Sequence, residues 1–493
     1  MRMNWADVLA ALHGTCGSSV SVPDTVAGVS TDNRKVRPGD VFFCIRGERF
    51  DGHEFAVEAV AGGAAAVVAD RKLELADAMV PPVPVVMVND ATRALGRLAR
   101  AWRERTAARV VGVTGTAGKT TVKELLAHVL STRGATARNA MNLNNQLGLP
   151  RSILATGGDE AYWVMEAGIS RAGDMDELGE ILAPDIALIL NAGAGHTEGL
   201  GDNVAAHKAR LIRYLKPGGL ALVNADYPDL VREARACVQN DAPVDAQVEL
   251  FTASCAGNPG EFAYSASYLG PETGSETHDG VPVIRGRYAV RLGYWEGVMI
   301  APFRGSYGAE NVVAVSAAAH ALGLEPEAIA SSLAHACLPA QRFACSRAGN
   351  WLVVDDSYNA NPLSTARMIE SAADLAVFPP AGIDGTLVCV LGEMLELGDR
   401  AEPEHEALGE HVAHSGARLV VWKGNQGQAV RRGLERAAFA GVFVEAADAD
   451  ALPGALEAHG LDGGVILFKG SRGNHLEEFV TRLVSVTENQ NAV

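Results

Sequence analysis

The chain has 493 residues, of which 48% are hydrophobic and 20% charged, a composition typical of globular proteins, and its length predicts about three domains. The formal net charge is −17, from 42 Lys and Arg against 59 Asp and Glu, which argues against nucleic acid as a partner. Seven scattered cysteines without a C-x-x-C pair argue against a disulfide framework or a zinc site. The chain starts without the apolar segment of a signal peptide, and no apolar run nears the roughly 20 residues of a membrane span. We therefore expect a cytoplasmic protein with no membrane span.

Residues 1–107 are predicted to form a small α/β domain. Apolar runs at 41–45, 65–69 and 84–88 are typical of strands, and residues 55–62 and 92–105 have the spacing of helices.

Residues 108–337 are predicted to form a central domain with a doubly wound, mainly parallel sheet. Strands are expected at 109–111, 161–166, 186–191 and 220–224, with helical segments between them, and this alternation is typical of βαβ units. The stretch 248–300, rich in Gly, Ser, Thr and aromatic residues, is expected to add antiparallel strands. The alanine-rich segment 311–322 predicts a buried helix.

Residues 338–493 are predicted to form a third, Rossmann-like domain. Its expected strands lie at 351–355, 386–391, 418–422 and 465–468, separated by helices. The chain is thus predicted to be an α/β protein of three domains.

The segment 112–121, Gly-Val-Thr-Gly-Thr-Ala-Gly-Lys-Thr-Thr, lies between the strand at 109–111 and a helix predicted over 122–130. Glycines at such a turn let backbone N–H groups approach phosphate oxygens, and the helix N-terminus favours negative charge. The spacing G-x-x-G-x-x-G-K-T departs from a strict Walker A motif, which would place glycine at Val113. A glycine-rich turn with a surface lysine is the structural alternative. We expect a P-loop for ATP formed by Gly115, Thr116, Ala117, Gly118, Lys119, Thr120 and Thr121.

Polar residues stand at or shortly after the ends of predicted strands in the central domain: Glu166, Asn191, His196 and Lys208. In open parallel sheets, ligands bind at this edge. Each residue alone has a structural explanation, as a solvated carboxylate, a hydrogen-bonded side chain or a surface lysine. Beside a P-loop, a carboxylate such as Glu166 together with phosphate oxygens is a suitable shell for Mg²⁺.

These motifs in this order resemble the Mur ligase family, the ATP-dependent amide ligases of bacterial cell-wall precursor synthesis. The resemblance covers nearly the whole chain. It includes the P-loop, Met165-Glu166-Ala167-Gly168 and the segment 191–198, together with further stretches at 30–34, 47–53, 142–150, 355–362, 391–398 and 469–472. The further stretches are similar to the branch of the family that joins D-alanyl-D-alanine to UDP-N-acetylmuramoyl-tripeptide.

The resemblance implies a reaction through an acyl phosphate. ATP would phosphorylate the terminal carboxylate of the UDP-linked tripeptide, and the amine of D-alanyl-D-alanine would displace phosphate to give the UDP-linked pentapeptide of peptidoglycan synthesis. By the same resemblance, the N-terminal domain would bind the UDP substrate, the central domain ATP, and the C-terminal domain the incoming dipeptide.

The resemblance also implies roles for single residues. Lys119, Glu166, His196 and Lys208 would be catalytic. Thr120 and Glu166 would contact a first Mg²⁺ and His196 a second, and Lys208 would carry a carbamate that contributes to the metal site. Arg210 departs from the family pattern, which often has Glu there.

Further roles concern the bound nucleotide and the two substrates. Asn311 would face adenine, and Arg342 and Asp356 would reach the γ-phosphate and the ribose; Glu310 stands where the pattern has His, and Gln341 where it has Gly. The residues implied for substrate binding are Ser30, Thr31, Asp32 and Arg34 at the UDP end, Asn142 and Asn145, and Asn359 and Asn361 facing the dipeptide.

Four alternatives remain open at this point: a sister Mur ligase that adds a single amino acid, a folylpolyglutamate-type ligase, a P-loop kinase, and a nucleotide-binding regulator without catalysis. A sister Mur ligase would have the same ATP site, so only the N-terminal and C-terminal domains can distinguish it from the dipeptide-adding enzyme. The regulator predicts the loss of Glu166, His196 or Lys208, which are all present. We expect a monomer whose domains close on ligand binding.

Overall fold

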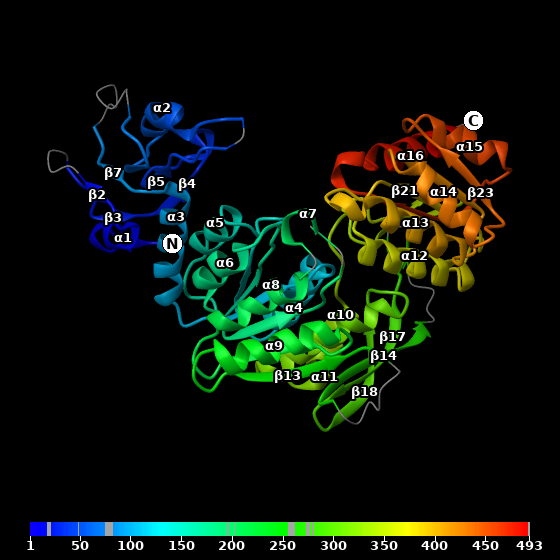
Figure 1. The fold of residues 1–493 in the computed structure, drawn as a ribbon, viewed down its shortest axis with the longest axis horizontal. Helices are drawn as coiled ribbons and strands as arrows, with labels where there is room; N and C mark the ends of the chain where they lie inside the picture. Colours follow the sequence, from blue (N-terminus) through cyan, green and yellow to red (C-terminus); the bar gives the residue numbers. More distant parts are fainter. Residues whose placement is uncertain are drawn as a thin grey trace.

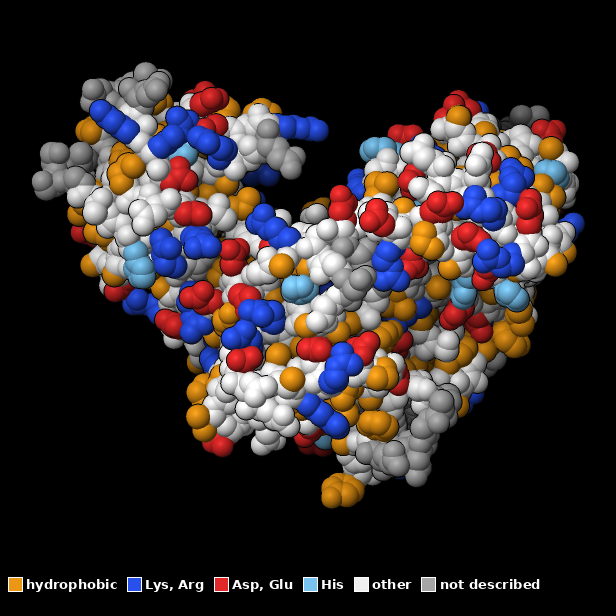
Figure 2. Space-filling view, in the orientation of Figure 1, with side chains coloured by type: hydrophobic (Ala, Val, Ile, Leu, Met, Phe, Trp, Pro, Cys, Tyr) orange, Lys and Arg blue, Asp and Glu red, His pale blue; other side chains and the backbone are white. Residues whose placement is uncertain are grey.

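The computed structural model describes residues 1–16, 21–47, 49–73, 82–193, 195, 197–201, 203–254, 262–272, 277–278 and 281–491. Three lobes follow one another along the chain and form an open arch, with a hollow between the first and the third (Figures 1 and 2). Each lobe is built on its own main sheet. Among the described helices, none is both long and apolar enough to cross a membrane.

The first lobe contains a sheet in the order β2-β7-β6-β5-β4, parallel except for β2. The runs expected at 41–45, 65–69 and 84–88 are strands β5, β6 and β7, and the expected helices are α2 and α3. The strands are β1 Met3–Asn4, β2 Thr15–Cys16, β3 Thr25–Val26, β4 Gly28–Ser30, β5 Asp40–Phe43, β6 Ala66–Ala69 and β7 Val85–Met87. The helices are α1 Trp5–Leu12, α2 Ala56–Ala61 and α3 Ala91–Glu104, with short turns η1 Asn33–Lys35 and η2 Gly52–Phe55.

Helix α3 joins the first lobe to the middle lobe (Figure 1). Its apolar face, including Leu95 and Leu98, belongs to a core cluster that also contains Ile153 of α5 and Leu178 of α6. The hydrophobic core is therefore continuous across the first boundary expected from the sequence.

The middle lobe has a nine-stranded sheet in the order β18-β17-β14-β13-β12-β11-β8-β10-β9. The strands are β8 Arg109–Thr114, β9 Thr136–Arg138, β10 Tyr162–Glu166, β11 Ile186–Ile189, β12 Leu220–Asn224, β13 Gln247–Thr252, β14 Tyr264–Pro271, β17 Gly286–Leu292 and β18 Trp295–Ala301, and a separate pair is β15 Thr277–His278 with β16 Val281–Pro282. The helices are α4 Lys119–Ser131, α5 Gly148–Leu154, α6 Asp174–Leu182, α7 Thr197–Leu200, α8 Val204–Ala209, α9 Pro228–Asn240, α10 Tyr307–Ala321 and α11 Pro326–Ala334, with η4 Arg210–Tyr214.

One expectation for this lobe is wrong in part. The sequence predicts antiparallel strands for the segment 248–300, but β13 is parallel to β12 and β14 is parallel to β13, and antiparallel pairing begins between β14 and β17. Helix α9 crosses over between β12 and β13, and such a crossover allows parallel pairing. The amino-acid composition of a strand does not reveal whether it runs parallel or antiparallel to its neighbour. The connection between the two strands decides that.

The third lobe has a sheet in the order β19-β20-β24-β21-β22-β23, parallel except for β19. The strands are β19 Ala344–Ala348, β20 Trp351–Asp355, β21 Leu387–Gly392, β22 Leu419–Lys423, β23 Val442–Glu445 and β24 Gly464–Lys469. The helices are α12 Pro362–Val377, α13 Ala401–Ala413, α14 Gly427–Arg436, α15 Ala451–Ala458 and α16 Glu477–Asn491, with η6 Gly398–Arg400 and η7 Arg472–Asn474. The four expected strands are present, whereas β19 and β23, at the two edges of the sheet, were not expected.

Candidate functional site

A cavity of about 450 Å³ lies between the middle and third lobes. Its walls contain most of the central residues that the sequence singled out. The middle lobe contributes Thr116, Ala117, Gly118, Lys119, Thr120, Thr121, Asn142, Asn145, Glu166 and Asn311, and the third lobe contributes Arg342, Asp356, Asn359 and Asn361.

The P-loop connects β8 to α4 and is held by Asn191. The Asn191 Oδ1 atom accepts a hydrogen bond from the backbone N–H of Ala117 at 2.8 Å, and its Nδ2 donates to the carbonyl of Ala117 at 3.1 Å. Gly118 has a φ of +82°, and a Cβ there would lie 2.8 Å from Oδ1 of Asn311. The positive φ therefore favours glycine at this position, and a side chain there would also force the amide of Asn311 to shift.

Lys119 occupies the inside of the P-loop. Its ammonium donates to the carbonyl of Gly115 at 2.8 Å and to that of Thr116 at 3.4 Å. Burial lowers the pKa of Lys119. In this structure the ammonium is therefore bound to the carbonyl groups of the P-loop itself.

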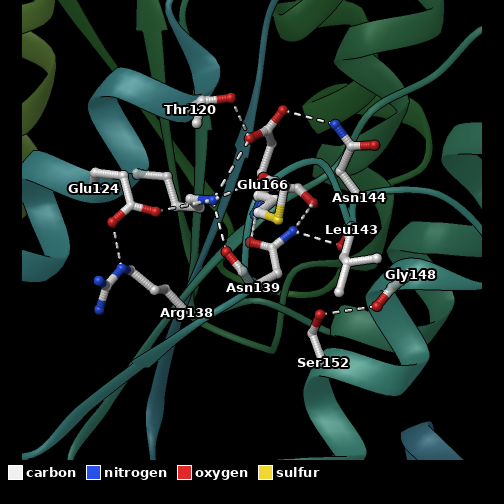
Figure 3. A network of polar contacts seen from close by, with 11 residues as sticks. Thr120, Glu124, Arg138, Asn139, Leu143, Asn144, Gly148, Ser152 and Glu166 are labelled. Atoms are coloured by element: carbon white, nitrogen blue, oxygen red, sulfur yellow. Dashed lines mark hydrogen bonds and ion pairs between the residues drawn. The ribbon is translucent and has the colours of Figure 1, made fainter. Parts of the chain in front are cut away.

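Glu166, at the end of β10, is almost fully buried and lies at the centre of a polar network (Figure 3). Its Oε2 accepts from the hydroxyl of Thr120 at 2.9 Å, and its Oε1 accepts from Nδ2 of Asn144 at 2.7 Å. A hydroxyl and a carboxylate side by side are the oxygen donors that Mg²⁺ takes beside phosphate oxygens and water. The residues present therefore fit a magnesium ion.

Three residues in this network, Lys123, Asn139 and Asn144, were not among the predicted site residues. Lys123, buried on α4, donates to the carbonyl of Asn139 at 2.6 Å, and its Nζ lies 4.0 Å from Oε2 of Glu166. Asn139 accepts from the backbone N–H of Glu166 at 2.9 Å and donates to its carbonyl at 3.1 Å. The sequence offered one signal for the burial of Lys123. It lies three residues before Leu126, on the same, apolar face of the predicted helix.

Lys208 lies on α8 and is only 3% exposed. Its pKa is well below the ordinary value, because of burial first and of the neighbouring charge of Lys119 second. Lys208 is not among the described residues that line the cavity. Arg210, the departure from the family pattern, forms an ion pair with Asp176 at 2.7 Å. His196 lies outside the described residues, and within them no cluster of three His, Cys, Asp or Glu side chains could hold a metal.

The third-lobe residues are held by a second buried lysine. Lys469 pairs with Asp356 at 2.6 Å and donates to the carbonyl of Asn359 at 2.6 Å. Burial lowers the pKa of Lys469, which the sequence analysis named only as part of a motif. The guanidinium of Arg342 stacks over the ring of Tyr358 at 4.2 Å. Nδ2 of Asn361 donates to the carbonyl of Thr116 at 3.3 Å, so the two lobes touch directly at the P-loop.

A smaller cavity of about 130 Å³ adjoins the loop after β20. Asn359 and Asn361 line it. Its other walls were not singled out as site residues and are Gly195, Ala360, Leu395, Glu396, Ser471, Arg472 and Gly473.

The residues expected at the UDP end lie on the first lobe, apart from both cavities. Asp32 accepts from the backbone N–H of Arg34 at 3.1 Å and from its Nε at 2.9 Å, while Arg34 is 80% exposed. The hydrogen bond from Arg34 is the main reason that the pKa of Asp32 falls to about 2. Ser30 donates to the carbonyl of Asp32 at 2.8 Å, and Thr31 lies between them.

Family models match three separate parts of the chain. The Mur ligase family catalytic domain matches residues 25–103, the Mur ligase middle domain matches residues 113–244, and the Mur ligase glutamate ligase domain matches residues 341–472.

Relatives and solved structures match over nearly the whole length. UDP-N-acetylmuramoyl-tripeptide–D-alanyl-D-alanine ligase of Escherichia coli is 32% identical, with 93% of this chain and 94% of the relative covered, and that of Bacillus subtilis is 30% identical, with 97% of both covered. A crystal structure of MurF from Acinetobacter baumannii has a TM-score of 0.83 at 27% identity, covering 98% of this chain and 99% of its own. MurF ligase from Thermotoga maritima in complex with ADP has a TM-score of 0.76 at 26% identity, covering 94% and 99%. The chain belongs to the Mur ligase family.

Proposed function

We propose that this chain is an ATP-dependent, ADP-forming ligase that joins D-alanyl-D-alanine to UDP-N-acetylmuramoyl-tripeptide, giving the pentapeptide precursor of peptidoglycan. The observation that carries the proposal is that relatives with this activity in their names match nearly the whole chain. The terminal carboxylate of the tripeptide takes the γ-phosphoryl group of ATP and becomes an acyl phosphate, with ADP released. The neutral dipeptide amine then attacks the carbonyl carbon and a C–N bond forms. The C–O bond to the phosphoryl group breaks, phosphate leaves with its electron pair, and the nitrogen loses one proton to solvent.

Lys119 is proposed to bind the outer phosphates of ATP. Its ammonium would leave the carbonyl of Gly115 and turn toward the phosphate oxygens, where it stabilises negative charge that develops in the transition state. We assign the other residues of the P-loop segment 115–121 to the phosphates as well. Asn311 is assigned to adenine, and Arg342 and Asp356 to the γ-phosphate and ribose, because all three line the same cavity.

Thr120 and Glu166 are assigned to a first magnesium ion and His196 to a second. Support for the first assignment is the 2.9 Å contact between the Thr120 hydroxyl and the Glu166 carboxylate. Magnesium bound there supplies positive charge to the phosphate oxygens. Asn144, which donates to Oε1 of Glu166, would hold the carboxylate in place for the ion.

Lys208 is proposed to carry a carbamate. A neutral amine can add to CO₂ with loss of one proton. Burial lowers the pKa of Lys208, and a lower pKa favours the neutral amine. The product is a carboxylate-like anion that can contribute to a cation site, whereas a free ammonium cannot. A carbamate carbon signal in ¹³C NMR with labelled bicarbonate, absent in Lys208→Met, would support the assignment; its absence from the wild type would remove it.

The outer lobes are proposed to bind the two substrates. We assign residues 1–107 to the UDP end, through Ser30, Thr31, Asp32 and Arg34, residues 108–337 to ATP, and residues 338–493 to the dipeptide, through Asn359 and Asn361. Asn142 and Asn145, which line the larger cavity, are assigned to the UDP-linked substrate. We propose a monomer that acts in the cytoplasm.

The test is phosphate release from ATP with UDP-N-acetylmuramoyl-tripeptide, measured with and without D-alanyl-D-alanine. We expect release that needs both substrates and a UDP-linked pentapeptide detected by mass spectrometry. A preference for a single amino acid as acceptor would instead identify a sister ligase. Release without any acceptor-dependent product would contradict the proposal.

A further inference from the structure

Helix α12 of the third lobe is buried on two sides of different character. Ile369, Ala372 and Leu375 belong to the apolar core of the third lobe. A second stripe on the same helix, Arg367, Ser371 and Asp374, has the i, i+4, i+7 spacing of one helix face. All three side chains of this polar stripe bind residues of the middle lobe, which lies next to α12 in Figure 1.

Arg367 makes the first of these contacts. Its guanidinium pairs with Glu310 of α10 and donates to the hydroxyl of Tyr227 at 2.6 Å, and Asn224 at the end of β12 donates to the other oxygen of Glu310 at 3.2 Å. Arg367 is 7% exposed, so the ion pair is largely removed from water. Glu310 stands next to Asn311, and both Asn311 and Arg367 line the larger cavity.

Asp374 makes the second contact, two turns further along α12. Its Oδ2 accepts from Nε of Arg304 at 2.6 Å and from the hydroxyl of Tyr268 at 3.0 Å. Ser371 donates to the carbonyl of Arg304 at 2.8 Å. Arg304 is 4% exposed and also donates to the carbonyl of Phe378 at 3.1 Å. The far end of α12 is thus fixed to the middle lobe by a second buried ion pair.

The start of α12 is the part closest to the phosphate site. Asn361 caps the helix by accepting from the backbone N–H of Ser364 at 2.9 Å, while its amide donates to Thr116 in the P-loop at 3.3 Å. Since a helix is a rigid element, anchors at Arg367 and Asp374 determine where its first residue and the preceding loop lie.

We propose that Arg367 and Asp374, through Glu310 and Arg304, are positioning residues that orient the third lobe over the P-loop, so that Arg342, Asp356 and Asn361 reach the nucleotide. The proposal rests on the proposed function for the role of those three residues. Ion pairs suit this task because they are directional. In addition, a buried charge that loses its partner is strongly destabilising. Glu310 and Arg367 come from different lobes, so each loses its buried partner if the lobes shift.

The test reverses the first pair by Glu310→Arg, Arg367→Glu and the double variant. We expect each single reversal to raise the KM for ATP by roughly 10- to 100-fold, because a buried charge then faces a like charge. The double variant should recover most of this loss, since the pair is restored with opposite polarity. The matched control is the same reversal of Arg432 and Glu402, an exposed ion pair within the third lobe, which should leave KM and kcat unchanged.

Binding of a non-hydrolysable ATP analogue, measured by calorimetry, separates this inference from the proposed function. If the wild type binds the analogue but makes no pentapeptide product, the proposed function fails, and the pair is still tested by binding. Single reversals that bind the analogue as the wild type does would overturn the inference, and so would a folded double variant that binds no better than the singles.

If the reversals do not fold, Tyr227→Phe is the second variant. It removes only the hydroxyl that accepts a hydrogen bond from Arg367. We expect a rise in the KM for ATP of roughly three- to tenfold in a variant that keeps the circular-dichroism spectrum of the folded protein, and an unchanged KM would overturn the inference.

Discussion

The hydroxyl of Thr120 donates to Oε2 of Glu166 over 2.9 Å, although 46 residues separate them in the chain. Thr120 stands in the first turn of α4 and Glu166 ends β10, which pairs in parallel with β8, the strand that leads into the P-loop. Parallel strands end at the same edge of a sheet, and this brings the two oxygen donors together. The contact joins the P-loop to the carboxylate proposed to bind magnesium.

Replacing Glu166 by Gln is expected to lower kcat by roughly 10²–10³-fold and to raise the magnesium concentration needed for half-maximal rate. A neutral amide is a weaker ligand than a carboxylate, and its N–H₂ group cannot accept from Thr120. Steady-state rates over a magnesium titration measure both effects. Glu180→Gln, at an exposed position of α6, is the control and should match the wild type. An unchanged magnesium requirement in Glu166→Gln would exclude this carboxylate as a ligand.

Asn139→Leu is expected to destabilise the fold by about 2–4 kcal/mol, because buried backbone groups lose their partners at roughly 1–3 kcal/mol each. Asn139 is fully buried and donates to the carbonyl of Leu143 at 2.8 Å, in addition to its paired hydrogen bonds with Glu166. Leucine is similar in size but offers no hydrogen bond. Urea unfolding gives the free energy of unfolding directly. Asn240→Ala, at an exposed helix end, should cost less than about 1 kcal/mol, and an equal cost at both positions would contradict the role of Asn139.

Gln341→Gly is expected to stabilise the protein by about 0.5–1 kcal/mol. Gln341 has a φ of +56°, a left-handed conformation that costs an L-residue roughly 1–2 kcal/mol and costs glycine little. This is the position where the family pattern has glycine. Ala340→Gly is the neighbouring control, because Ala340 is not among the residues with positive φ and glycine there should only add freedom to the unfolded chain. Thermal and urea unfolding compare the two, and a loss of stability in Gln341→Gly would contradict the expectation.

The stability of the protein is expected to fall as the pH drops below about 6.5, partly because of His405. This imidazole accepts from the backbone N–H of Met394 at 2.9 Å, lies 2.6 Å from the carbonyl of Ala401, and is fully buried, and burial lowers its pKa. Below the unfolded pKa the unfolded chain binds a proton that the native state does not, so unfolding is favoured until the pH reaches the lower native pKa. One such proton changes the free energy of unfolding by up to about 1.4 kcal/mol per pH unit.

His405→Gln cannot take up this proton, so its free energy of unfolding should depend less on pH between 7.5 and 5.5 than that of the wild type. Trp422 packs edge-on against His405 at 5.5 Å and provides a fluorescence signal for urea titrations. His459→Gln, at an exposed position, should keep the wild-type pH dependence. Equal pH slopes in wild type and His405→Gln would show that His405 is not responsible.

The parts of the site that the sequence predicted are those formed by neighbours in the chain. The P-loop is a continuous segment whose glycines, lysine and flanking strand and helix are all visible in the letters, and the structure has them at the expected positions. Strand ends carrying Glu166 and Asn191 were predicted for the same reason. The direction of β13, the buried position of Lys123 and the pairing of Lys469 with Asp356 were not, since each depends on segments that are distant in the chain.

The sequence by itself determined the family, the nucleotide loop and the α/β character of the three lobes, because these depend on local spacing and on motifs that are read one segment at a time. Only the tertiary structure decided how the lobes meet. The partner of Glu310 is 57 residues away in α12, and that of Arg304 is 70 residues away in the same helix. A charged side chain in a sequence can pair with any opposite charge, and burial selects the one partner that the packing of the lobes brings within reach.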